Sequence, residues 1–410
     1  MKQPTTALPG AFWRHFSASA ASNLGDGMIA AAAPLLALSL TDDVRLIAFT
    51  SVASTLPWLV LSLPAGVFID RHDRKAILTT VNTVRCALFV MLVALIFTDV
   101  LTMWMLLAIL LAVAVCEVFF DMAAQAFLPA IVPDDELERA NGRLYAVEVT
   151  ANSFLGLPFG SWLFVVAAAA PFAVHAAALG LSALLIASIR SQATPAQVAS
   201  STNFLASLRE GLVWLWRHRL LRLLALMLGA ANMCHMFGQA IFAKYVRDEL
   251  GLGPRGFGVL LATMSVGSIV GGTAGGRIAK RLGPATSIVL AYACFAALEM
   301  VPAAYPRVWA VVAAGFAMSV VGTLWNVITV SLRQRLIPAE LFGRVNSVYR
   351  FIGAGTMTIG AAIGGFIAFR FGLRATYWAS AGTLGMVLVV GAPRLLRLAR
   401  VANAPGDSGT

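Results

Sequence analysis

The sequence predicts an all-α membrane protein with twelve transmembrane helices, and three observations support this fold class. The chain of 410 residues is 59% hydrophobic and 12% charged, whereas a soluble domain is about 25% charged. Apolar segments long enough to span a bilayer recur along the chain, and two pairs of loops repeat. No soluble core could bury so much apolar surface, so lipid is the expected solvent for most of the chain.

A spanning helix needs about 20 mostly apolar residues. In a bilayer, backbone groups must satisfy their hydrogen bonds within the segment, which favours helices over open sheets. The predicted spans are residues 13–39, 46–69, 76–97, 102–125, 144–167, 171–189, 221–243, 256–279, 285–304, 307–330, 347–369 and 374–393.

The distribution of basic residues predicts the orientation. Most of the 30 Lys and Arg residues fall in alternate loops, and loops rich in these residues stay cytoplasmic. We therefore expect a multi-pass protein of the cell inner membrane with both termini in the cytoplasm. The first apolar stretch is long and contains Asn23 and Asp26, so we interpret it as a retained helix rather than a cleaved signal peptide.

The chain is predicted to form two bundles joined by a linker. Residues 1–190 form an N-terminal six-helix bundle, and residues 221–400 form a C-terminal one. Between them, residues 191–220 begin with a small, polar, flexible stretch and continue as an amphipathic helix on the cytoplasmic leaflet. Residues 401–410 are expected to be a disordered tail.

Two loop pairs suggest that a six-helix unit is duplicated. IVPDDELERANGRLY (131–145) and LIPAELFGRVNSVY (336–349) align Pro133 with Pro338 and Arg139 with Arg344, and GVFIDR (66–71) aligns with GRIAKR (276–281). Parallel six-helix repeats with a midplane substrate site between them are a transporter architecture. The expected fold is therefore two pseudo-symmetric six-helix bundles around a central cavity.

The loop after the second span carries a recognisable motif. It reads GVFIDRHDRK (66–75) and resembles the GxxxDRxGRR signature of the major facilitator superfamily, with Asp73 in place of the inner glycine. The resemblance implies a gating motif in which the acid latches the two halves at the start of the eleventh helix. The alternative is a basic loop that only anchors the chain at the anionic leaflet. The motif residues are Gly66, Asp70, Arg71, Arg74 and Lys75.

Three further segments narrow the resemblance. Residues 21–41, 56–71 and 208–218 are similar to the branch that contains enterobactin exporters and macrolide efflux pumps, the transmembrane secretion effectors. This resemblance implies a secondary active transporter that exports a siderophore- or drug-like amphipathic molecule by proton-coupled alternating access. The alternatives are a lysophospholipid or nutrient transporter of the same fold, and a non-transporting membrane sensor or scaffold.

Small residues recur on several predicted helices. Gly156/Gly160, Gly267/Gly271/Gly275 and Gly360/Gly364 have the spacing that lets transmembrane helices approach closely. In the family, the helices that carry them form the seam between the halves. GLPFG (156–160) also resembles part of the Pro-Gly motif of antiporters, although a helix kink at Pro158 explains it equally well.

Ionisable residues inside apolar spans are costly and are functional candidates. Asp26 and Glu117 come nearest to mid-membrane, so we expect them to carry the coupling proton. The competing interpretation is that Asp26 hydrogen-bonds across a close helix contact beside Gly25 and Gly27. The predicted proton-coupling or cavity residues are Asp26, Glu117, Asp121, Glu148, Asn232 and His235.

Arg85 lies at the same predicted depth as Asp121, on adjacent helices, so we interpret the two as a structural ion pair. Glu117 and Asp121 share a helix face at i, i+4. Glu148 could instead be solvated near its helix end, His235 could be a simply hydrogen-bonded core residue, and Glu299 is interpreted as structural.

Other functional classes lack their signatures in this sequence. No lysine follows a glycine, so there is no phosphate-binding loop, and no spacing of Cys or His predicts a metal site. The four cysteines are interpreted as small core residues. Despite a net charge of +11, no basic face interleaved with aromatic residues predicts nucleic-acid binding. We expect no enzyme activity and no cofactor, and a monomer whose partners are a small-molecule substrate, protons and lipid.

Overall fold

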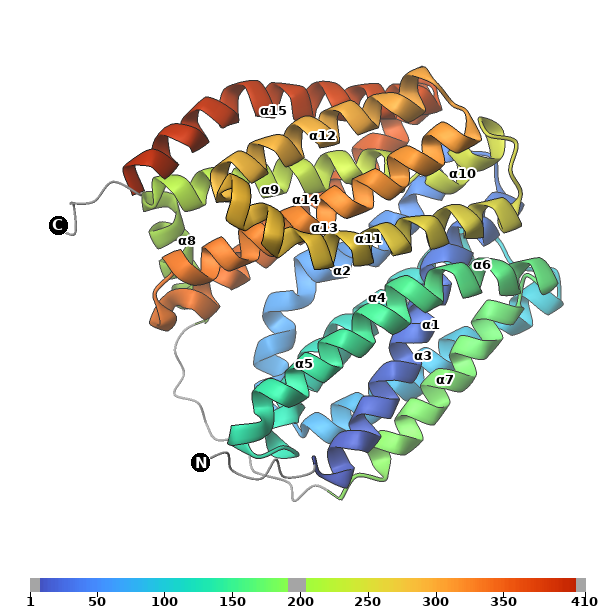
Figure 1. Cartoon of the computed structure of the whole chain (residues 1–410). Helices are drawn as coiled ribbons and strands as arrows, with labels where there is room; N and C mark the ends of the chain where they lie inside the picture. Colours follow the sequence, from blue (N-terminus) through green and yellow to red (C-terminus); the bar gives the residue numbers. More distant parts are fainter. Residues whose placement is uncertain (1–7, 191–203, 403–410) are drawn as a thin grey trace. The chain divides into compact units, whose positions relative to one another are not determined.

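The computed structural model describes residues 8–190 and 204–402, in which every regular element is helical (Figure 1). The first half of the chain forms α1 Gly10–Leu40, α2 Val44–Arg71, α3 Arg74–Phe97, α4 Met103–Phe127, the 3-10 turns η1 Leu128–Ala130 and η2 Asp134–Glu136, α5 Leu137–Glu148, the π-helix η3 Val149–Gly156, α6 Leu157–Val166 and α7 Ala170–Ala187. The second half forms α8 Phe204–Arg217, α9 Arg219–Gln239, α10 Phe242–Asp248, α11 Pro254–Leu282, α12 Pro284–Ala304, α13 Val308–Leu336, α14 Ala339–Phe371 and α15 Leu373–Ala402.

Twelve helical segments in the described residues are long and apolar enough to cross a membrane, which confirms the predicted number of spans. Three of them consist of more than one element. The fourth span combines α4 and η1, the fifth combines η2, α5, η3 and α6, and the seventh combines α9 and α10. The predicted fifth span began at residue 144, but the helix starts at Leu137 because Pro133 and the acidic turn η2 initiate it earlier.

Contacts divide the chain into two compact units. Unit 1 comprises Met1–Asp42, Leu56–Ser201 and Gly253–Val259, and unit 2 comprises Asp43–Thr55, Thr202–Leu252 and Leu260–Thr410. In unit 1, α7 packs along both α1 and α3, and α3 packs on α4 (Figure 1). In unit 2, α15 packs along both α9 and α12, and α12 packs on α13. The same pairings thus recur between spans that occupy the same place in each six-helix half.

The predicted linker 191–202 and residues 403–410 of the predicted tail lie outside the described residues. The amphipathic segment is a helix, α8, and it packs on α14 within unit 2. Leu215 of α8 is buried, Glu210 pairs with Arg344 at 2.6 Å, and Gly211 leaves no room for a side chain against the Arg344 main chain. The predicted domain boundaries and the contact of α8 with a leaflet remain predictions.

Several glycines predicted to line a seam make close contacts within their own unit. In unit 1, a Cβ at Gly160 of α6 would clash with the Met28 main chain of α1. In unit 2, Cβ atoms at Gly360 and Gly364 of α14 would meet the main chain of α9. The fifth span is therefore packed on the first, and the eleventh on the seventh, at backbone distance.

The Pro158 motif coincides with a change of helix type. The π-helix η3 ends at Gly156, and Pro158 lies in the first turn of α6. Proline supplies no backbone N–H and tolerates the first turn of a helix, so a new α-helical segment can start there. Wide π turns inside membrane helices are frequent at functional sites.

Candidate functional site: a buried charged cluster in unit 1

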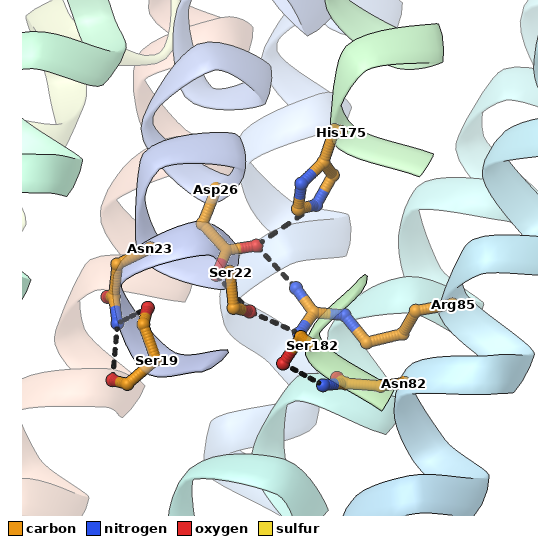
Figure 2. Close-up of polar contacts among 8 residues, drawn as sticks. All are labelled: Ser19, Ser22, Asn23, Asp26, Asn82, Arg85, His175 and Ser182. Carbon is orange, nitrogen blue, oxygen red and sulfur yellow. Dashed lines mark hydrogen bonds and ion pairs between the residues drawn. The ribbon is translucent and has the colours of Figure 1, made fainter. Parts of the chain in front are cut away.

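The centre of the site is an ion pair between α1 and α3. The Arg85 side chain on α3 is wholly buried, with 0% of its surface exposed, and a guanidinium nitrogen pairs with Asp26 Oδ1 on α1 (Figure 2). The Asp26 side chain retains 17% exposure. Arg85 is buried, so it supplies a fixed positive charge in the interior of unit 1.

A histidine from α7 completes the contact with Asp26. His175 Nε2 lies 3.3 Å from Asp26 Oδ1, and its ring is fully buried. The ring occupies the place that a Cβ at Gly25 would take, and it lies edge-on to Phe89 of α3, with ring centroids 4.6 Å apart. Because Gly25 has no side chain, α1 and α7 can approach closely enough for this contact.

Neutral polar groups orient the charged ones. Ser22 Oγ donates to Asp26 Oδ2 at 3.3 Å and accepts from Arg85 at 3.4 Å. One turn from Arg85, Asn82 Nδ2 donates to Ser182 Oγ of α7 at 2.8 Å (Figure 2). These bonds connect α3 to both α1 and α7 in the interior.

Two acids on α4 share the same guanidinium. Glu117 and Asp121 both interact electrostatically with Arg85, as Asp26 does. Both side chains are half-buried, and the Phe120 ring between them lies 5.9 Å from the guanidinium carbon of Arg85. Three carboxyl groups therefore interact with one cation. If all three were ionised, the negative charge would exceed the positive charge inside a bilayer, which is costly.

The sequence predicts an ion pair of Arg85 with Asp121. In the structure Arg85 pairs with Asp26 and also interacts electrostatically with Asp121, so the predicted pair remains a prediction. Depth in the membrane relates α3 to α4, but it does not show that α1 also packs in this part of the unit. Sequence reasoning also missed His175, Ser22, Asn82 and Ser182. A lone histidine in the otherwise apolar span 171–189 was the available signal.

The other predicted cavity residues lie elsewhere. Glu148 is exposed at the end of α5. Asn232 and His235 belong to α9 in unit 2, where Asn232 is half-buried and His235 is exposed. Their predicted roles remain predictions.

The gating motif lies at the junction of α2 and α3. Asp70 and Arg71 are exposed at the end of α2, and Arg74 donates to the Ala126 carbonyl of α4 at 3.0 Å. Asp73, which replaces the glycine of the family motif, caps α3 by accepting a hydrogen bond from the Lys75 N–H at 3.0 Å. This capping function gives a physical reason for an acid at that position. The latch remains a prediction.

Among the described residues, no group of three or more His, Cys, Asp or Glu side chains is arranged to hold a metal ion.

Comparisons with known proteins agree on the family. The family model described as transmembrane secretion effector matches residues 9–406. Macrolide efflux protein A of Streptococcus pyogenes is 24% identical over 362 residues, covering 87% of this chain and 88% of its own. Multidrug efflux pump Tap of Mycolicibacterium fortuitum is 25% identical over 401 residues, covering 93% of this chain and 95% of its own.

Solved transporters share the fold at low sequence identity. The nucleoside transporter NupG superposes with a TM-score of 0.74 at 8% identity, covering 94% of this chain and 99% of its own. A bacterial homologue of the iron transporter ferroportin in an inward-facing state superposes with a TM-score of 0.67 at 14% identity, covering 94% of this chain and 100% of its own. With twelve apolar spans, a matching fold and a family model that covers nearly the whole chain, this protein belongs to the transmembrane secretion effector family of major facilitator transporters.

Proposed function

We propose that this protein exports an amphipathic, siderophore- or drug-like small molecule by alternating access, in exchange for protons. The names of its relatives, a macrolide efflux protein and a multidrug efflux pump, support export of this substrate class. We further propose a monomer in the bacterial inner membrane with both termini in the cytoplasm, in contact with lipid and with neither cofactor nor catalytic chemistry.

The observation that carries the proton coupling is the charge imbalance around Arg85. One guanidinium offsets one carboxylate, yet three carboxyl groups interact with it. Ions of one sign are not left unbalanced in a medium of low dielectric constant, and the usual remedy is to bind protons. A cluster that must gain or lose protons as its solvent access changes is suited to couple proton movement to transport.

The contacts support different roles for the acids. Asp26 is held as a partner of Arg85 by the ion pair, by Ser22 and by the nearby His175. A guanidinium favours the ionised form of the carboxyl that it contacts, so we place the exchanging proton on Glu117. When Glu117 releases its proton, its carboxylate competes with Asp26 for the guanidinium. This competition would loosen the tie between α1 and α3.

Everted membrane vesicles provide the test. In vesicles from a host without its own drug pumps, we expect this protein to accumulate erythromycin when the lumen is acidic, and a protonophore to abolish accumulation. The variant Asp26→Asn/Glu117→Gln should retain downhill exchange and lose uphill accumulation.

Other results would support the alternatives. Uptake that persists without a pH gradient would indicate a facilitative carrier. Movement of a labelled lysophospholipid but not erythromycin would favour the lipid transporter. Absence of transport for every probe would favour the sensor or scaffold.

A further inference from the structure

Unit 2 contains a buried carboxyl group outside the cluster already described. Glu299, for which the sequence suggests a structural role, lies on α12 with 7% of its surface exposed. Its Oε2 atom is buried and has no hydrogen-bond partner among the described residues. An ionisable group in this position inside a membrane protein is costly unless something compensates it.

The neighbours of Glu299 include a second unsatisfied polar atom. Tyr377 of α15 is 5% exposed, its hydroxyl has no partner in the described part of the chain, and it interacts electrostatically with Glu299. Ser380, one turn further along α15, also approaches the Glu299 carboxyl and donates to the Cys234 carbonyl of α9 at 3.2 Å. The Glu299 Oε2 atom on α12 and the Tyr377 hydroxyl on α15 thus both lack a hydrogen-bond partner among the described residues, and the two side chains interact with each other.

Among the described residues, no Lys, Arg or His interacts electrostatically with this carboxyl. Arg374, which precedes Tyr377 on α15, pairs with Glu249 at 2.7 Å. Cys234 comes from α9, and Tyr377 from α15. Tyr245 of α10 already donates to the Pro302 carbonyl at 2.8 Å, and Tyr292 on α12 itself donates to the Met227 carbonyl. In the sequence of α13 no titratable side chain precedes Arg333. A carboxylate here would have no counter-charge, whereas a protonated carboxyl adds an O–H donor for which the Tyr377 hydroxyl is a possible acceptor.

The position also matches the cluster in unit 1. There, Asp26, Arg85 and His175 come from the first, third and sixth spans, and the His175 ring fills the space beside Gly25. In unit 2, Cys234, Glu299 and Tyr377 come from the seventh, ninth and twelfth spans. The Tyr377 ring fills the space beside Gly238 of α9. Each half therefore places its buried ionisable groups on corresponding helices.

We propose that Glu299, together with Tyr377, forms a second proton-binding site of this transporter, whose proton exchanges with solvent. As a coupling site it rests on the proposed proton-driven export. The Glu299 carboxyl is the acid, and the Tyr377 hydroxyl is the positioning group that accepts its hydrogen bond directly or through water.

Infrared difference spectroscopy of the purified protein in lipid tests the site without any substrate. The acid-minus-alkaline spectrum should contain the C=O stretch of a protonated carboxyl, and this band should shift in D₂O. Glu299→Gln should remove one such band and leave that of Glu117, and Tyr377→Phe should shift the frequency of the Glu299 band because the hydrogen bond is lost. Glu138→Gln, an exposed acid on α5, should leave it unchanged.

Two results would overturn the proposal. Identical difference spectra of the wild type and Glu299→Gln would show that Glu299 does not exchange a proton. A Glu299 band that is present but insensitive to pH and D₂O would show a permanently protonated, structural group. Should Glu299→Gln fail to fold, the Tyr377→Phe shift still decides, since an unchanged band contradicts the proposed contact.

The transport readout separates this proposal from the proposed function. In the vesicle assay, Glu299→Gln should lower uphill erythromycin accumulation by roughly tenfold and leave downhill exchange intact. A wild type without pH-driven accumulation would refute proton-coupled export, yet leave the spectroscopic result standing. Normal accumulation by Glu299→Gln would refute only the role of Glu299 in coupling, and it would leave proton-coupled export standing.

Discussion

Arg85 and Asp26 are 59 positions apart in the chain and form an ion pair in which the guanidinium is completely buried. The pair connects α3 to α1, and His175 adds α7 to the same contact. The same contact therefore contributes to stability and holds the charges of the cluster. Removing either partner changes both, and the following predictions separate the two effects.

The ion pair is predicted to behave as a buried unit in a double-mutant cycle. Arg85→Gln leaves buried carboxyl groups without their cation, which should cost roughly 3–5 kcal/mol. Asp26→Asn/Arg85→Gln should lose less than the sum of the single variants. The measurement is thermal unfolding in detergent. As control, Arg45→Gln breaks an exposed pair with Asp43 and should cost at most about 1 kcal/mol. If the losses of stability in the Arg85 and Asp26 variants were additive, the two residues would not act as a coupled ion pair.

The sequence predicted the spans and the charged helices better than the pairing inside the cluster. Glu117 and Asp121 were placed on one face of a helix by their spacing, and both do interact with Arg85. Hydropathy gives depth along a helix, but it does not give the azimuth at which one helix meets another. The contact of Arg85 with Asp26 depends on that azimuth, which Gly25 and His175 set by close packing. For the same reason, the unsatisfied oxygens of Glu299 and Tyr377 could not be paired from the sequence.

The topology is predicted to place position 196 and the C-terminus on the same, cytoplasmic side. A tag beside Asp99 should be external, since Asp99 is exposed in the turn between α3 and α4. Accessibility to a membrane-impermeant label in intact cells measures all three sites. Opposite-side labelling of position 196 and the C-terminus would rule out an even number of spans in the second half.

The gating motif is predicted to act through the carboxylate of Asp70. Asp70→Ala should raise the inward-open population roughly two- to five-fold, because an anion near a helix N-terminus contributes about 0.3–1 kcal/mol. Cross-linking yields between engineered cysteines in the two halves report the population. Asp73→Asn is the matched control. It removes a negative charge near Asp70 but keeps the helix cap, since asparagine also caps a helix. Equal populations in the wild type and Asp70→Ala would leave the motif as a membrane anchor.

Close packing of α6 on α1 is predicted to be sensitive to a single methyl group. Gly160→Ala would place Cβ within the Met28 main chain, which cannot move aside as a flexible side chain can. Overpacking of this kind costs about 1–3 kcal/mol, so the melting temperature in detergent should fall. Gly382→Ala on α15, where nothing lies within 4 Å of the added atom, should be neutral or slightly stabilising. Equal melting temperatures of Gly160→Ala and Gly382→Ala would contradict the close contact of α6 with α1.

The last prediction assigns the coupling proton among the acids around Arg85. Glu117→Gln keeps the shape and hydrogen bonding of the side chain but removes its exchangeable carboxyl proton. It should therefore bind substrate and exchange it downhill, yet lose pH-driven accumulation by about tenfold or more. Asp26→Asn should lose accumulation too, with an added loss of stability, because it also breaks the contact with Arg85. Asp121→Asn should have a smaller effect on coupling, and the exposed Glu138→Gln should have none. Wild-type accumulation by both Asp26→Asn and Glu117→Gln would place the coupling site elsewhere, with Glu299 as the next acid to examine.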